Sequence, residues 1–158
     1  MNDVLTNLKL SLLNVGYAKV DQTWDYADIV SPFSRLYLIL GGSAKVYHHQ
    51  QVFTLKENHL YLIPSFTNSK YKCDSYMEQY YVCFMEEIGT GFSVYNRYAF
   101  LYEKEASALE ISLFERLLAI CPNRALPSYN TKVYDNPTQL KLFLDLNDGL
   151  SAKNHIEV

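Results

Sequence analysis

The stretch of residues 31–73 constrains the fold more than any other part of this chain, because short alternating runs are broken there by turn residues. In Arg35–Leu40, successive side chains of an extended chain point to opposite faces, so the three leucines share one face. Gly41-Gly42 is expected to turn the chain, and Pro64 to end a later strand, since proline cannot donate to a ladder. Such spacing is typical of an all-β sandwich or barrel, which can enclose a ligand. Further strands are expected at residues 44–49, 51–55 and 60–63.

Residues 1–30 allow two interpretations, because the leucines there fit both a strand and one stripe of a helix. Leu8, Leu10 and Leu12 alternate as in a strand, whereas Leu5, Leu8 and Leu12 are spaced as on a helix. We favour strands in this region. The remaining strands are expected at residues 17–20, 23–26, 71–73 and 79–85, with the β region ending near Glu86.

A helical pattern follows the strands. Ser107 and Glu110 have the spacing of a capping box, and apolar residues follow them at helical intervals. After a loop over residues 124–135, Asn136 is the expected cap of a second helix that Gly149 ends. We therefore divide the chain into a β-barrel at residues 1–105 and a helical extension at residues 106–158.

Length and charge limit the possible functions. A chain of 158 residues is long enough for one domain with its own core. Its net charge of -3 and scattered Lys and Arg residues argue against a nucleic-acid groove in this segment. Three cysteines without metal or redox spacing indicate free thiols, and hence the cytoplasm. No segment has the features of a secretion signal or the length of a membrane span.

Several motifs between residues 24 and 85 occur in an order that resembles the regulatory domain of AraC-type transcription regulators. That family carries W-x-Y, S-P-F-x-R-x-Y, glycine-turn and L-x-L-I-P segments. The first 20 residues and the helices match the family only loosely. The matching segments here are Trp24-Asp25-Tyr26, Ser31-Pro32-Phe33 with Arg35-Leu36-Tyr37, Gly42, and Leu60-Tyr61-Leu62-Ile63-Pro64.

The resemblance implies a mainly β fold, a cupin-like barrel of the double-stranded β-helix or jelly-roll type followed by C-terminal α-helices. It implies a cytoplasmic sensor domain without enzymatic activity, metal or cofactor, whose barrel binds a small polar effector such as a sugar. DNA is expected to be contacted only by a C-terminal helix-turn-helix domain that this fragment lacks. The full-length protein is expected to be a homodimer without membrane contact. The exposed face of the helix at residues 108–120 is the expected coupling surface.

In this family the effector is held by inward side chains on the strand after the L-x-L-I-P segment and on its paired strand. The matching ligand-binding positions are Tyr71, Gln79 and Tyr81, with Trp24 as a wall and Arg35 as a further donor. Gln79 and Tyr81 are two residues apart and share a face, as two cavity-lining residues must. Aromatic faces with amide and hydroxyl groups suit a sugar. Each residue taken alone also fits ordinary packing, as a core aromatic or a solvated arginine.

A metal-dependent cupin enzyme, an isomerase or dioxygenase, is the alternative. Such enzymes carry a His-x-His pair, a nearby glutamate and a later histidine, whereas His48 and His49 are adjacent and would face opposite sides of a strand. A site from His48, Glu57 and His59 stays open. No serine or cysteine lies in a nucleophile motif, so no catalytic residue is assigned. A third interpretation is a ligand-free interaction module whose cavity is filled by its own tyrosines.

Overall fold

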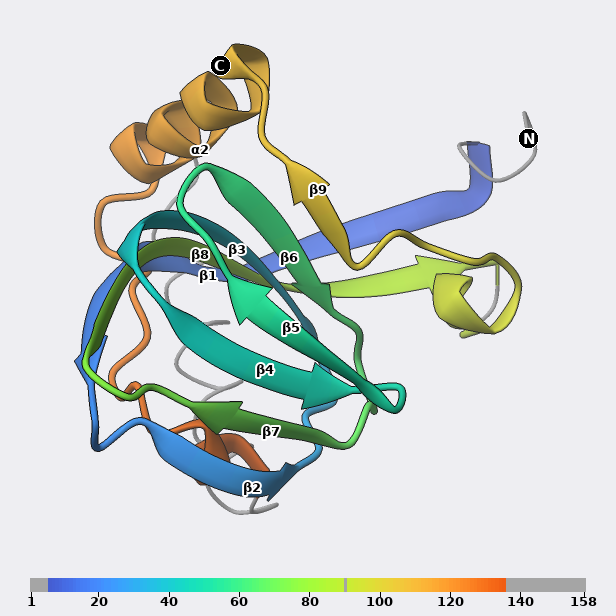
Figure 1. Ribbon diagram of the computed structural model, residues 1–158. Coiled ribbons are helices and arrows are strands. Elements are labelled where there is room, and N and C mark those ends of the chain that lie inside the picture. Colours follow the sequence, from blue (N-terminus) through green and yellow to red (C-terminus); the bar gives the residue numbers. More distant parts are fainter. Residues whose placement is uncertain (1–5, 90, 136–158) are drawn as a thin grey trace.

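The computed structural model describes residues 6–89 and 91–135. Two antiparallel sheets enclose the core, and helix α2 (Ala108–Ile120) lies outside one of them (Figure 1). Two short 3-10 helices lie before and after α2 in the sequence: η1 (Val94–Asn96) precedes it and η2 (Thr131–Asp135) follows it. The strands are β1 (Leu8–Asp21), β2 (Asp25–Ile29), β3 (Ser34–Gly42), β4 (Ala44–His48), β5 (Gln51–Leu55), β6 (His59–Ile63), β7 (Ser69–Lys72), β8 (Tyr76–Ile88) and β9 (Glu103–Glu105).

The strand pairing identifies the type of barrel. One sheet has the order β1-β8-β3-β6-β9 and the other the order β2-β7-β4-β5. The pairs β1/β8, β2/β7, β3/β6 and β4/β5 are all antiparallel, as in one long hairpin whose turn lies between β4 and β5. Successive pairs of this hairpin alternate between the two sheets, which is the jelly-roll arrangement that cupins share. The prediction of a mainly β, jelly-roll barrel is confirmed.

Strand β3 is apolar on both faces because each face lies against another layer. Arg35, Tyr37 and Ile39 are at most 3% exposed and face the interior of the barrel. The leucines between them lie on the outer face, where Leu36 lines a groove next to α2. The alternation predicted for residues 35–40 is therefore confirmed, and the tertiary structure adds which face points inward.

Strand β1 is continuous, so the strand interpretation of the N-terminal leucines is confirmed. It pairs with β8 along its whole length, with one bulge between Leu12 and Asn14. The first of the two short strands expected near the N-terminus is the second half of β1. The second begins only at Asp25, because the backbone N–H and the hydroxyl of Thr23 both donate to Oδ1 of Asp21 and hold a turn.

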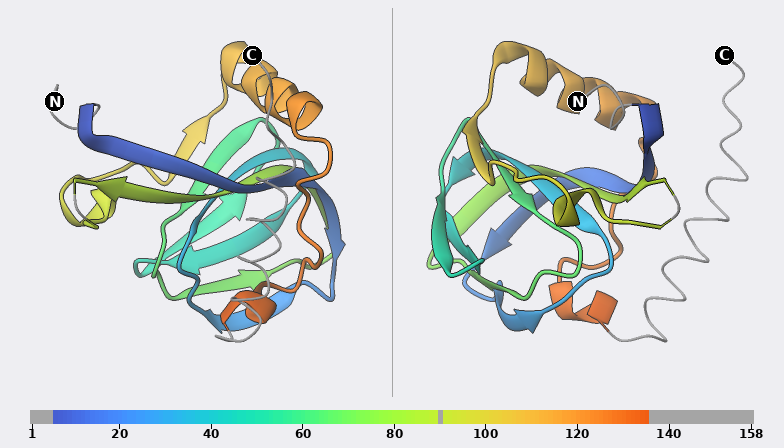
Figure 2. Two further views of the ribbon diagram at one scale, coloured as in Figure 1. Left: turned by 180° about the vertical axis from the view of Figure 1, so that it is seen from behind. Right: turned by 90° about the vertical axis from the view of Figure 1, so that its right-hand side faces the viewer.

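The β region extends past its predicted end near Glu86. Strand β8 runs to Ile88, and its last residues pair with the start of β1 in an arm that projects from the barrel (Figures 1 and 2). The Glu86 carboxylate accepts hydrogen bonds from Ser65 Oγ (3.1 Å), Ser93 Oγ (2.8 Å) and the Val94 N–H (2.7 Å). These bonds hold the chain after β8 in place before β9 pairs with β6.

Helix α2 begins with the predicted capping box. Ser107 Oγ accepts a hydrogen bond from the Glu110 N–H (3.4 Å), and the Glu110 carboxylate accepts one from the Ser107 N–H (2.6 Å). An ion pair with Lys104, together with the Ser107 bonds, lowers the pKa of Glu110 to about 2. The second helix, expected from Asn136 to Gly149, lies outside the described residues.

Two findings bear on the expected compartment. Cys73, Cys83 and Cys121 are free thiols in the structure. Within the described ranges, no helix combines the length and the apolar character that a membrane crossing would need. The cytoplasmic location itself stays a prediction.

Candidate functional site

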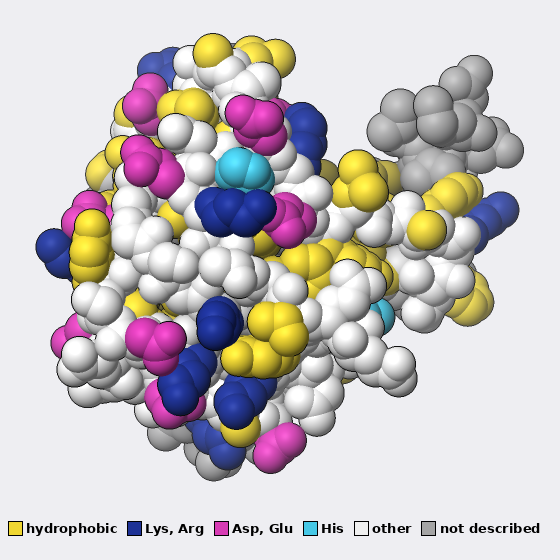
Figure 3. All heavy atoms as spheres, viewed as in Figure 1, with side chains coloured by type: hydrophobic (Ala, Val, Ile, Leu, Met, Phe, Trp, Pro, Cys, Tyr) yellow, Lys and Arg dark blue, Asp and Glu magenta, His cyan; other side chains and the backbone are white. Residues whose placement is uncertain are grey.

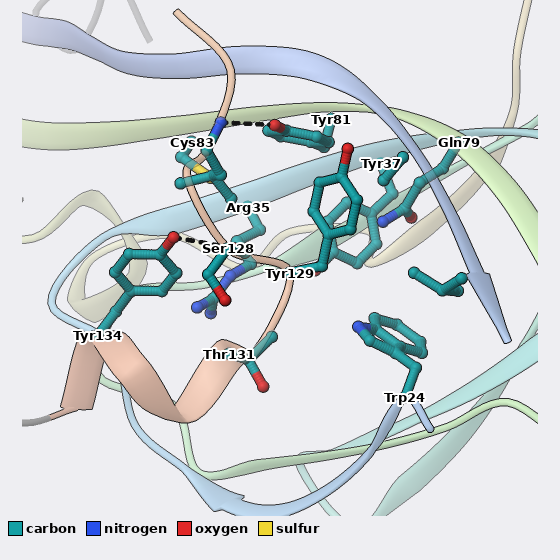
Figure 4. A pocket seen from close by; sticks show the side chains of 13 residues that line it. Trp24, Arg35, Tyr37, Gln79, Tyr81, Cys83, Ser128, Tyr129, Thr131 and Tyr134 are labelled. Carbon is teal, nitrogen blue, oxygen red and sulfur yellow. Dashed lines mark hydrogen bonds between the residues drawn. The ribbon is translucent and has the colours of Figure 1, made fainter. Parts of the chain in front are cut away.

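The barrel encloses a small cavity lined by polar and aromatic side chains. Its walls come from the interior face of β1, β8 and β3, from Trp24, and from the segment that follows α2 (Figure 4). About 20 Å³ is open to the centre of a water molecule. That is room for about one ordered water.

The register of the sheet decides which side chains meet there. Tyr81 on β8 lies opposite Gly16 on β1 and opposite Tyr37 on β3. Any side chain at position 16 would crowd Tyr81, because a Cβ built there would lie 2.5 Å from the Tyr81 hydroxyl oxygen. Two residues earlier on β8, Gln79 lies opposite Ala18, whose small side chain leaves the Gln79 amide at the cavity.

All five predicted ligand-binding residues are buried, with exposed fractions between 0% and 4%. Gln79 and Tyr81 share the inward face of β8, as their spacing predicts. Tyr71 belongs to the other sheet, where its ring packs edge to face on Trp24 with centroids 5.0 Å apart. Whether this group binds a ligand stays a prediction. Of the five predicted residues, Trp24, Arg35, Gln79 and Tyr81 line the cavity itself, and Tyr71 does not.

Arg35 is buried at 2% exposure, so the packing interpretation of a solvated arginine is wrong for this residue. Its Nη2 donates to Ser31 Oγ (2.8 Å), and its Nη1 donates to the Tyr71 hydroxyl (3.4 Å). Its guanidinium carbon lies 4.8 Å from the ring centroid of Phe33. Two residues of the S-P-F-x-R motif, Ser31 and Phe33, therefore contact the arginine of the same motif and fix its position.

Two polar atoms in the cavity wall have no hydrogen-bond partner in the described part of the structure. These atoms are Oε1 of Gln79 and Oγ1 of Thr131, and both side chains are at most 5% exposed. An unpaired buried polar group costs about 1–3 kcal/mol, so folded proteins rarely retain one. Their position at one cavity indicates that a bound polar molecule, water or ligand, completes these bonds.

Burial keeps the hydroxyl and thiol groups around the cavity neutral. Desolvation raises the pKa of Cys83 and that of Tyr134 to about 12 each. It also raises the pKa of Tyr37 and that of Tyr81 above their usual value. At neutral pH these groups therefore form hydrogen bonds without being ionised. Such a lining suits an uncharged polar ligand.

The sequence interpretation missed the residues that close the cavity. It assigned residues 124–135 to a loop, but Tyr129, Thr131 and Tyr134 from this segment line the cavity. Composition gave no signal, because the two tyrosines of this segment, Tyr129 and Tyr134, match the aromatic content of the whole chain, 15%. These residues have neither the strand nor the helix period, so no periodicity marked them as buried.

The two adjacent histidines do not line this cavity. His48 ends β4, and His49 has φ 49°, so the turn brings their Nδ1 atoms to 2.8 Å from each other. The expectation that they face opposite sides is wrong, because the extended backbone stops at His48. His59 Nδ1 lies 3.0 Å from the backbone oxygen of Glu57. Across residues 6–89 and 91–135, no three His, Cys, Asp or Glu side chains group so as to hold a metal ion.

A larger groove of about 500 Å³ lies between α2 and the outer face of the five-stranded sheet. Its lining is apolar except for Glu110. Phe114 is the buried residue of α2 and packs at this groove. Leu109 and Leu113 of the same helix are 68% and 58% exposed. The coupling surface expected on the helix at residues 108–120 therefore does carry exposed leucines.

No protein-family model and no curated protein matches the chain. Solved structures similar to it include a cupin-2 domain protein from Shewanella frigidimarina, with 14% identity over 48% of this chain and 69% of that one, at a TM-score of 0.37. The lyase DddQ from Ruegeria pomeroyi, which acts on DMSP, has 12% identity over 58% and 56%, at a TM-score of 0.40. The salicylate 1,2-dioxygenase from Pseudaminobacter salicylatoxidans has 8% identity over 52% and 30%, at a TM-score of 0.39.

One expectation is corrected by these comparisons. The resemblance stated from the sequence implied that the chain is not an enzyme, but two of these three similar structures are enzymes. The structures similar to this chain therefore include enzymes, which contradicts the expectation that the chain lacks enzymatic activity. A likeness at 8–12% identity assigns no activity either, so the presence or absence of catalysis does not follow from it.

Proposed function

We propose that this chain is the effector-sensing regulatory domain of an AraC-type transcription regulator, whose barrel binds a small polar metabolite, a carbohydrate. The effector would alter dimerisation of the full-length protein and DNA binding by a helix-turn-helix domain outside this chain. The observation that supports the proposal is the Gln79 amide oxygen, which has no hydrogen-bond partner among the described residues and lies at the cavity together with Arg35 and aromatic rings. The sequence motifs that resemble this family contribute Trp24 and Arg35 to the same cavity.

The cavity chemistry fits an uncharged polyhydroxy compound. A sugar hydroxyl can donate to the Gln79 amide oxygen and accept from neutral tyrosine hydroxyls. The ring of Trp24 offers an apolar face to sugar C–H groups. Few charged side chains line the cavity, and the guanidinium of Arg35 is already bonded to Ser31 and Tyr71. A neutral ligand therefore needs less rearrangement than a charged one.

The present size of the cavity sets a condition on this function. About 20 Å³ admits a water molecule and excludes a monosaccharide. The alternative interpretation, a ligand-free interaction module whose cavity is filled by its own tyrosines, explains this small volume without an effector. An effector-binding barrel requires that Thr131 and Tyr134 give way, because these buried side chains come from the segment after α2 and line the cavity (Figure 4).

The proposal is tested by thermal melting in the presence of monosaccharides, oligosaccharides and sugar acids. A ligand at about 100 times its Kd stabilises the folded state by about 2.7 kcal/mol, which raises Tm measurably. At least one sugar should raise the Tm of the wild-type chain and of the control Gln51→Met, an exposed glutamine on β5. The same sugar should have no effect on Gln79→Met, which keeps the side-chain volume and removes the amide.

Three results would contradict this function. If no compound of the panel raises Tm, or if Gln79→Met responds like the wild type, the cavity is not the sugar site. A stoichiometric metal that is lost on replacing His48 or His59 would instead support a metal-dependent cupin enzyme. A stable Gln79→Met protein is expected without ligand, since the substitution removes an unpaired buried oxygen.

A further inference from the structure

One wall of the cavity is formed by a segment of the chain itself, residues 122–135, which we name the plug. Figure 2 shows it running from the end of α2 along the side of the barrel to η2. Its first part is fastened to the edge strand β1. The Val15 N–H donates to the backbone oxygen of Arg124 (3.0 Å), and the Arg124 Nη2 donates to the backbone oxygen of Leu12 (3.2 Å).

The middle and end of the plug contact the residues that line the cavity. The Leu126 N–H donates to the Tyr81 hydroxyl (2.7 Å), and the Tyr129 hydroxyl donates to the backbone oxygen of Tyr17 (3.0 Å). The Tyr134 ring packs edge to face on Phe33, with centroids 5.9 Å apart. The plug therefore binds through single hydrogen bonds and ring contacts rather than through a ladder of paired backbone groups.

The plug is also more weakly buried than the strands beneath it. Between residues 122 and 134, the buried side chains are those of Thr131 and Tyr134, and Thr131 Oγ1 has no hydrogen-bond partner in the described part of the chain. Segments with few buried contacts and exposed backbone open at a lower free-energy cost than the core of a domain. Such a segment can separate from the barrel while the jelly roll stays folded.

We propose that the plug is a built-in occupant of the barrel's ligand site, and that a ligand enters only when the buried side chains of Thr131 and Tyr134 leave the cavity. The ligand part of this inference rests on the function proposed above; the opening of the plug does not. The plug begins directly after Cys121, the C-cap of α2. Displacement of the plug therefore frees the C-terminal end of that helix from its attachment to the barrel. A ligand that binds only the open form shifts the population toward it. The plug thereby couples the cavity to α2.

Two native cysteines report on the opening of the plug. Cys83 is fully buried in the cavity wall beneath the plug, whereas Cys73 is 2% exposed and does not line the cavity. Iodoacetamide should therefore reach Cys83 when the plug opens, and should reach Cys73, whose thiol donates to the Ser43 backbone oxygen, when the barrel opens elsewhere. The rates of modification of both cysteines, measured by mass spectrometry on the native full chain, separate the two events.

A matched pair of tyrosine variants tests the plug. Tyr129→Phe removes the plug's bond to Tyr17, and its control Tyr61→Phe removes barrel bonds to the backbone of Lys56 and Thr54. Tyr129→Phe should raise the rate of Cys83 modification by about threefold, and Tyr134→Ala should raise it by about tenfold or more. Neither variant should change the rate of Cys73 modification. Tyr61→Phe should not raise the ratio of the Cys83 rate to the Cys73 rate.

Equal increases at Cys83 and Cys73, or an unchanged Cys83 rate in both plug variants, would overturn the inference. If Tyr134→Ala does not fold, Tyr129→Phe alone decides. The ligand part is tested with D-glucose and D-glucuronate, or with any sugar that raises Tm, by trypsin cleavage after the exposed Lys132 in the plug. A sugar that binds should accelerate this cleavage. If a sugar binds without accelerating this cleavage, the inference about the plug is wrong and the proposed function stands. If the plug variants raise the rate of Cys83 modification but no sugar binds, the inference about the plug is supported and the proposed function is contradicted.

Discussion

Gly16 shows how a single missing side chain shapes the candidate site. A Cβ on residue 16 would lie 2.5 Å from the Tyr81 hydroxyl oxygen and 3.2 Å from the Ala125 Cβ of the plug. This space lets Tyr81 reach the Leu126 N–H (2.7 Å). One glycine on β1 thereby permits the contact between the barrel and the plug.

We expect Gly16→Ala to destabilise the protein by about 1–3 kcal/mol, because the new methyl group forces the packed Tyr81 ring to move. The matched control is Gly41→Ala, where an added Cβ meets no atom within 4 Å and φ is not positive. The control should change the free energy of unfolding by less than about 0.5 kcal/mol. Urea unfolding of both variants measures the difference, and equal stabilities would contradict the close approach at Gly16.

His48 makes the stability of the barrel depend on pH. Burial, and then the neighbouring His49, lower its pKa to about 4 from the ordinary value of 6.5. Its ring stacks on Phe53, with centroids 4.6 Å apart. Since the unfolded chain binds the proton more readily, His48 stabilises the folded state fully above pH 6.5, and this contribution is lost as the pH falls from 6.5 toward 4.

Replacing His48 by phenylalanine keeps a ring against Phe53 and removes the titration. The urea concentration at the unfolding midpoint of the wild type should therefore decrease as the pH is lowered from about 7.5 to about 5. The decrease should be smaller for His48→Phe. His59→Gln, a histidine replacement outside this cluster, controls for the loss of any histidine. A variant whose midpoint falls as steeply as that of the wild type would show that His48 is not the group responsible.

At the scale of elements, α2 is held by its N-terminus and by one face. The capping box joins Ser107 to Glu110, and Glu110 also pairs with Lys104 of β9. Phe114 is the buried residue of the helix and packs toward the sheet. The start of α2 is therefore fixed to the strand before it, while the end of the helix leads into the plug.

We expect Ser107→Ala to destabilise the protein by about 1 kcal/mol, because the Glu110 N–H loses its acceptor at the helix start. Ser75→Ala, in the exposed turn before β8, serves as the control. Its effect should stay within about 0.5 kcal/mol. Urea unfolding followed by circular dichroism measures both variants. If they are equally stable, the cap does not fasten α2.

Element prediction from the sequence succeeded where the period was long enough to be read. The alternation of β3 and the capping box of α2 both follow from spacing alone, and both are observed. β9 was missed because three residues are too few to show a period. The histidine pair was misjudged because His49 leaves the extended conformation, which a rule about strands cannot anticipate.

At the scale of the whole molecule, the surface mixes charges with exposed apolar side chains. On the face in Figure 3, acidic and basic side chains lie among each other and hydrophobic ones lie between them. The exposed leucines Leu10, Leu109 and Leu113 are more than half exposed and lie in or beside the groove between α2 and the sheet. An apolar groove of about 500 Å³ is within the size range of small-molecule sites.

We expect the folded protein to bind the hydrophobic dye 1-anilinonaphthalene-8-sulfonate at this groove. Leu113→Glu places a charge in the groove lining and should weaken the fluorescence of the dye by about half or more. Leu101→Glu changes a leucine that is 81% exposed and outside the groove, so the fluorescence should persist. Equal fluorescence of the two variants would place the dye elsewhere.

The sequence by itself determined which side chains share a face of a strand, since a period of two residues fixes this, and where α2 starts, since capping residues fix that. It also brought the predicted residues Gln79 and Tyr81 to one face. The tertiary structure alone decided what fills the barrel. Contacts such as that between Tyr129 and Tyr17, 112 residues apart, belong to a loop without a period. Local spacing carries no information about such pairs, because they form only when the segment after α2 packs against β1.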